Sequence, residues 1–143
     1  VHMNGIYQEK LLAHARAPAG AGTIPPGTED AEVFNSACGD EIRVKLTWTP
    51  EGALAGLTHE THGCAVCQAA ASLAVPRLVG KTAAEIAGLA AAFYSRLGQS
   101  GFEEAWGDFQ MFNGLEKYPA RLACARLIWQ AVERALAPKL GRP

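Results

Sequence analysis

Positive and negative charges nearly cancel in this sequence, and long apolar runs are missing. The 143 residues include 13 lysines and arginines against 14 aspartates and glutamates, a formal net charge of −1. Proteins whose main task is to grip nucleic-acid phosphates are usually strongly basic, so this balance argues against a nucleic-acid partner. The alanine-rich stretch 83–92 is interrupted by Glu85 and Gly88, so no segment reaches the ~18 apolar residues of a membrane span.

The composition predicts one folded domain. Disorder needs low hydrophobicity and high net charge, whereas this chain is 49% hydrophobic. Domains typically hold ~100–200 residues, which predicts a single domain that we place at 3–140. Val1 and His2 precede Met3 and are interpreted as cloning remnants outside that domain.

Cysteines are few, and they are the strongest candidates for a functional site. The four lie at positions 38, 64, 67 and 124. Two disulfides in a small secreted protein are one interpretation, but we expect no secretory signal, and the core needs no such staples. Cysteines that gather in a cytoplasmic protein are more often metal ligands or reactive thiols. We therefore expect a cytoplasmic protein with a thiol-based site.

Apolar spacing in the first half predicts a helix followed by a sheet. Tyr7, Leu11 and His14 follow helical spacing within 5–16. Residues 41–49 alternate between apolar and polar side chains, which is typical of a half-buried strand. The turn at 50–52 predicts a hairpin with a return strand at 54–61, and 31–34 is a weaker candidate for a third strand.

The second half has helical patterns. We expect a helix at 65–79 that Pro76 kinks or ends, because proline lacks the amide that a helix interior needs. Thr82 and Glu85 have the spacing of a capping box, which opens a second helix reaching about residue 97. The predicted fold class is α+β, with an N-terminal helix, a three-stranded antiparallel sheet and C-terminal helices packed on it.

The remaining segments are an insertion and a last helix. Residues 99–114 are predicted to hold one short helix at about 102–109. Pro119 suits the first turn of the last helix, which Pro138 ends. The expected buried stripe of that helix consists of Leu122, Ala125, Trp129, Val132 and Leu136.

Three cysteines are expected at the ends of elements. Cys38 lies in a loop with Asp40, Cys64 lies where a strand meets a helix, and Cys124 lies near the start of the last helix. Zinc takes four sulfur, nitrogen or oxygen ligands, and this set offers three sulfurs and one carboxylate. The spacings match no compact zinc finger, and buried cysteines often act as small apolar residues, so both interpretations stay open.

Longer motifs resemble a known family. The stretches 36–40, 63–66 and 118–125, which carry the three cysteines, resemble the U-type iron–sulfur assembly proteins (IscU and the NifU N-terminal domain). Residues 5–14 and 80–82 also resemble that family, so the likeness covers nearly the whole chain. The scaffold branch has a histidine before its third cysteine, where this chain has Ala123. The SufU branch has the pattern formed here by Pro119, Arg121, Cys124, Ala125, Leu127 and Trp129, and an insertion like 99–114 before it.

The resemblance implies a function and a ligand set. A SufU-like protein would accept persulfide sulfur from a SufS-type cysteine desulfurase for iron–sulfur cluster assembly, and a SufBCD-type scaffold complex is a further implied partner. Cys38 would be the sulfur acceptor, freed when a histidine of the desulfurase takes its place on zinc, and Arg121 would support negative charge there. The implied zinc ligands are Cys38, Asp40, Cys64 and Cys124.

Several alternatives remain open at this stage. The same ligands suit a scaffold that assembles an iron–sulfur cluster and transfers it to apo-proteins. Cys64 and Cys67 could form a redox dithiol, or zinc could be purely structural. Cys67 stands where the family usually has serine; we favour a buried replacement over a resolving thiol or a competing ligand. His62 is expected on the surface and Arg121 could be merely solvated.

Overall fold

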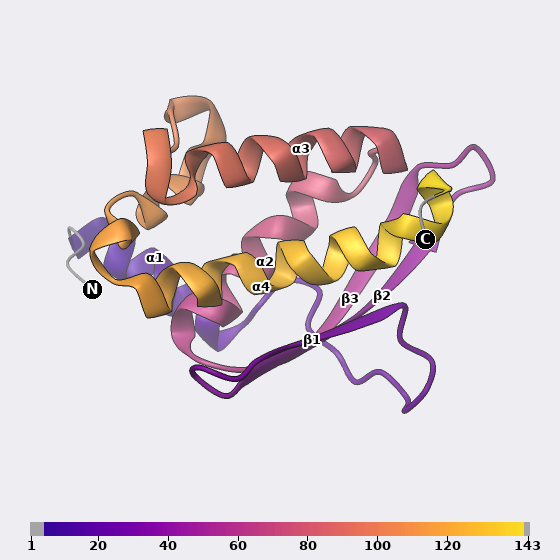
Figure 1. The fold of residues 1–143 in the computed structure, drawn as a ribbon, viewed down its shortest axis with the longest axis horizontal. Coiled ribbons are helices and arrows are strands. Elements are labelled where there is room, and N and C mark those ends of the chain that lie inside the picture. The colour runs from indigo at the N-terminus through magenta and orange to yellow at the C-terminus, as the bar shows by residue number, and fades with distance from the viewer. Residues whose placement is uncertain (1–4, 142–143) are drawn as a thin grey trace.

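The computed structural model describes residues 5–141, so Val1, His2 and Met3 lie outside the described residues. The predicted α+β fold is confirmed. The three strands form one layer, α2 and α4 cover one face of the sheet, and α3 packs on the far side of α4 (Figure 1). The elements in chain order are α1 (Gly5–Arg16), β1 (Ala31–Asn35), β2 (Asp40–Trp48), β3 (Leu54–His62), α2 (Ala65–Leu78), α3 (Ala83–Ser95), η1 (Arg96–Ser100), η2 (Glu104–Phe112), η3 (Leu115–Lys117), α4 (Pro119–Leu136) and η4 (Ala137–Leu140).

The sheet follows the predicted alternation closely. Its order is β1-β2-β3, and both pairings are antiparallel. Along β2, Ile42, Val44 and Leu46 are buried while the residues between them are partly exposed. Side chains on a strand point to alternate faces, so the apolar set packs under the helices. The third strand, predicted at 31–34, extends to Asn35, whose pairing with Asp40 closes the hairpin.

Helix α2 is the centre of the core. Its alanines at 69, 70, 71 and 74 are fully buried. Small side chains let α2 approach α1, α4 and the sheet closely, which leaves no space for bulkier residues. Pro76, expected to kink or end this helix, lies inside the last turn of α2, which continues to Leu78.

The insertion differs from the predicted single helix at 102–109. The chain makes a wide turn at η1 and then a 3₁₀ segment, η2, in which Gly107 has a φ of 59° and interrupts the helical path. Aromatic packing adds to the 3₁₀ hydrogen bonds in holding this region. Phe93 stacks on Trp129 with ring centroids 4.7 Å apart, and the side chains of Phe102, Trp106 and Phe109 gather around them.

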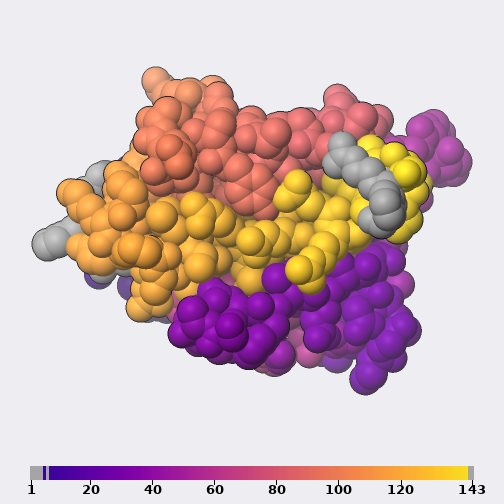
Figure 2. All heavy atoms as spheres, in the orientation of Figure 1, coloured from indigo at the N-terminus to yellow at the C-terminus, as the bar shows by residue number. Residues whose placement is uncertain are grey.

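The last helix lies across the middle of the molecule. Figure 2 shows α4 as a band between α3 and the sheet. Of the predicted stripe, Ala125, Trp129, Val132 and Leu136 are buried, while Leu122 is partly buried. The α-helix ends at Leu136, and the chain passes Pro138 in a 3₁₀ turn. Over residues 5–141, no helix combines the length and apolarity that crossing a membrane requires.

The capping box at the start of α3 gives a direct test of local stability. The Thr82 hydroxyl accepts a hydrogen bond from the Glu85 amide, and the Glu85 carboxylate accepts one from the Thr82 amide. We expect Thr82→Ala to lower the free energy of unfolding by about 1 kcal/mol, because the cap oxygen is lost. Urea denaturation measures this. Thr82→Ser keeps the oxygen and should stay near wild type; equal losses in both variants would contradict the capping role.

Candidate metal centre

A tight hairpin presents Cys38 and Asp40 together. Residues 36–39 connect β1 to β2, and Gly39 adopts a φ of 75°, which glycine accepts without strain. The Asn35 side-chain oxygen accepts a hydrogen bond from the Ala37 amide at 3.1 Å, which fixes the loop. Cys38 is exposed at its tip, whereas Asp40 is only 4% exposed. The hairpin therefore offers one accessible thiol and one buried carboxylate.

Cys124 approaches this hairpin from α4. It lies in the second turn of the helix and is fully buried. Its Sγ is 3.5 Å from the Sγ of Cys38. Burial, followed by hydrogen bonds within the group, raises the pKa of the Cys124 thiol. Among the described residues, the donor atoms of Cys38, Asp40 and Cys124 form a group in which all lie within 4.8 Å of one another.

Cys64 borders the group without belonging to it. It is the N-cap residue of α2 and is partly buried, and after burial and Asp40 its side chain is a further cause of the raised pKa of the Cys124 thiol. In Figure 1 the β1–β2 loop, the β3–α2 connection and the start of α4 all lie at the same end of the molecule. Of the four predicted ligands, the structure thus gathers three tightly and places the fourth against Cys124.

The chemistry of this group suits a cation. Asp40 Oδ2 is buried and has no hydrogen-bond partner in the described part of the chain. An unsatisfied buried carboxylate oxygen is costly, and a metal ion bound to it would remove that cost. Sulfur and carboxylate donors together are a set that zinc accepts. The residues present therefore fit a zinc ion.

Gly63 makes room for the carboxylate. A Cβ atom at position 63 would lie 2.8 Å from Asp40 Cγ, closer than real Cβ contacts. Only glycine lets the end of β3 pass so near Asp40. The sequence shows Gly63 beside Cys64 but not this close approach, which depends on the pairing of β2 with β3.

Arg121 lies at the rim of the thiols. Its side chain is exposed, and its electrostatic interaction with the Cys64 thiol, followed by that with Cys124, raises the pKa of its guanidinium. A fixed positive charge at this place favours negative charge on sulfur. The fold thus brings Arg121 to the site, next to Cys64.

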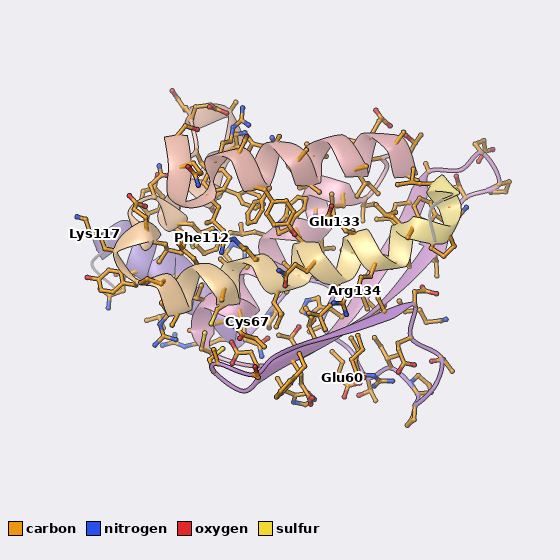
Figure 3. The ribbon with its side chains drawn as sticks, in the orientation of Figure 1. Glu60, Cys67, Phe112, Lys117, Glu133 and Arg134 are labelled. Atoms are coloured by element: carbon orange, nitrogen blue, oxygen red, sulfur yellow. The ribbon has the colours of Figure 1, made fainter. Side chains whose placement is uncertain are left out.

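Cys67 lies behind the site, in the core. Figure 3 labels it beneath the first half of α4, and it is fully buried. Burial, with a smaller effect of Asp40 and the neighbouring thiols, raises the pKa of the Cys67 thiol. An inaccessible, protonated thiol is a poor nucleophile, so this placement favours a buried serine replacement over a redox dithiol with Cys64.

The two histidines of β3 lie outside the group formed by Cys38, Asp40 and Cys124. His62 is 62% exposed and contacts the Glu60 carboxylate at 3.3 Å, consistent with the predicted surface position. His59 is fully buried, where its ring contacts the carbonyl of Ala19 at 2.8 Å and the hydroxyl of Thr61 at 2.7 Å. Burial lowers the pKa of His59. His59 therefore fixes the loop after α1 to the edge of the sheet.

Comparison with known proteins places this geometry in a family. Residues 6–137 match the family described as NifU-like N terminal domain. The chain is 30% identical to the iron-sulfur cluster assembly scaffold protein IscU of Thermotoga maritima, over 96% of each chain. It is 26% identical to the zinc-dependent sulfurtransferase SufU of Bacillus subtilis, over 98% of this chain and 95% of that protein.

Solved structures show the same fold. The N-terminal NifU-like protein of Brucella abortus superposes with a TM-score of 0.76 at 28% identity, over 94% of this chain and 96% of that one. A putative assembly scaffold protein for the SUF system from Fervidobacterium islandicum gives a TM-score of 0.78 at 26% identity, over 94% and 99%. The family match spans both the sheet and all four α-helices, with the three gathered ligands inside it. The chain therefore belongs to the family of NifU-like N-terminal domains.

Proposed function

We propose that this protein is a zinc-dependent sulfur-transfer protein of iron–sulfur cluster assembly, which accepts persulfide sulfur from a SufS-type cysteine desulfurase. One observation carries the proposal: two thiols lie 3.5 Å apart beside the carboxylate of Asp40, whose buried Oδ2 has no hydrogen-bond partner among the described residues. The named function of the Bacillus subtilis relative supports it. So does Ala123, which replaces the histidine of the scaffold branch.

The ligand set follows from the gathered donors. Cys38, Asp40 and Cys124 would hold the ion, and Cys64 would complete four ligands from its position against Cys124. Bound zinc would keep the ligating thiols deprotonated, which is the form that attacks sulfur. Because Gly63 has no Cβ atom, it leaves space for the Asp40 carboxylate.

Exposure supports Cys38 as the sulfur acceptor. Cys38 is exposed on its hairpin, whereas Cys124 is fully buried and out of a partner's reach. The Cys38 thiolate would attack the terminal sulfur of the donor persulfide. A new S–S bond forms at Cys38 as the donor's S–S bond breaks, and the donor cysteine leaves as a thiolate. Arg121, beside the thiols, would stabilise the negative charge that moves between the two sulfurs.

Metal content tests the ligand set. We expect about one zinc per chain in the purified protein, because structural and catalytic zinc sites bind tightly at neutral pH. Asp40→Ala and Cys124→Ala should lose most of it, since each removes a ligand. Plasma mass spectrometry of gel-filtered protein gives the ratio. Cys67→Ser is the matched control and should retain zinc; zinc-free wild-type protein would refute the site.

Sulfur transfer tests the role of Cys38. Cys38→Ala should abolish the stimulation of a SufS-type desulfurase, measured as alanine formed from cysteine, because the acceptor sulfur is gone. Its circular dichroism spectrum should stay unchanged, and Cys67→Ser should stimulate normally. If Cys38→Ala instead unfolds the chain, the zinc is structural and the transfer role is wrong.

The scaffold function is the second candidate, favoured by the name of the Thermotoga maritima relative and by thiolates that also suit a cluster. Anaerobic reconstitution with iron and sulfide separates the two functions. For a sulfur-transfer protein we expect no transfer of a cluster to an apo-ferredoxin, measured by recovery of the ferredoxin's absorbance spectrum. Efficient transfer, together with no effect on desulfurase turnover, would favour the scaffold.

A further inference from the structure

An apolar pocket of about 220 Å³ opens directly beside the thiols. Leu11 and Leu12 of α1 form one wall, and Ala65 and Val66 at the start of α2 form another. Gln8 adds a polar side chain to the α1 wall, and the pocket reaches the candidate site itself, because Cys64 and Arg121 also line it. We call this the Leu12 pocket.

Two exposed apolar side chains lie near this end of the molecule, and a third lies elsewhere. Among the described residues, the large apolar side chains classed as exposed are Leu12 at 39%, Phe34 at 59% and Val79 at 38%. Leu12 lines the pocket, and Phe34 borders a second hollow that includes Ala123, the residue before Cys124. Val79 follows α2 at its other end. Exposed apolar groups concentrated beside a reactive site mark a surface that another protein covers.

The charge on the pocket narrows the choice of partner. The described residues that line it include Arg121 and no carboxylate, and Arg121 lines the pocket together with Cys64, with whose thiol it interacts electrostatically. An occupant must therefore combine an apolar group with a negative charge near the thiols. A second copy of this chain fits poorly, because a two-fold contact of this patch would bring two Arg121 side chains together.

We propose that the Leu12 pocket receives an aliphatic side chain of the sulfur-donating enzyme, next to the persulfide that faces Arg121. The inference rests on the proposed function and adds the place where the donor is anchored. An apolar anchor in a pocket and a charge at its edge are the usual arrangement of a protein–protein hot spot. The anchor would hold the persulfide at the thiols, within reach of Cys38 on its exposed hairpin.

Titration calorimetry tests the anchor. It measures the affinity of the zinc-loaded protein for a purified SufS-type desulfurase. Leu12→Asp should weaken binding by about tenfold or more, which corresponds to about 1.4 kcal/mol. Leu12→Met keeps an aliphatic side chain and should remain within about a factor of two of wild type. Val79→Asp is the matched control, because Val79 has nearly the same exposure as Leu12, at the far end of α2.

Zinc content and melting temperature distinguish a loss of binding from a loss of folding or of metal. Each variant should retain the zinc content and melting temperature of wild type, and Leu12→Gln replaces Leu12→Asp if the charge disturbs α1. Leu12→Asp binding as tightly as wild type, or no more weakly than Val79→Asp, overturns the anchor while leaving sulfur transfer standing. Wild-type protein that neither binds nor stimulates the desulfurase overturns the proposed function, and the anchor with it.

Discussion

The close packing of α4 against α2 and the sheet is the constraint on which the site depends. Alanines that are fully buried on α2 permit this approach, because a larger side chain would hold the helices apart. The first turns of α4 thereby reach the hairpin between β1 and β2, and Cys124 becomes buried 3.5 Å from Cys38. Removing this contact would separate ligands that lie 86 residues apart in the chain.

The three cysteines of the site differ in solvent exposure. Cys38 is accessible on a hairpin tip, Cys124 is sealed in the core, and Cys64 lies between these extremes at the N-cap of α2. Asp40 Oδ2 is buried and has no hydrogen-bond partner among the described residues, so a bound cation would stabilise it. Buried polar atoms without partners are rare in folded proteins, so such an oxygen beside two thiols indicates a functional site.

The sequence predicted the regular elements well where local physics dominates. Alternating side chains in β2 and the capping box of Thr82 depend on neighbours a few residues away, and both were recovered with bounds shifted by a residue or two. The insertion was predicted less well. Its path depends on Gly107 at positive φ and on aromatic rings from α3 and α4, which no local pattern in 99–114 displays.

The sequence alone determined the α+β class, the hairpin, the family resemblance and the candidate ligands, because these follow from periodicity and from motifs read along the chain. Tertiary structure decided how those ligands stand to one another. It set Cys38, Asp40 and Cys124 within 4.8 Å, left Cys64 beside them, and buried Cys67. It also required glycine at position 63 and opened the Leu12 pocket. Such distances depend on how separate elements pack, and packing is a property of the whole core rather than of any one segment.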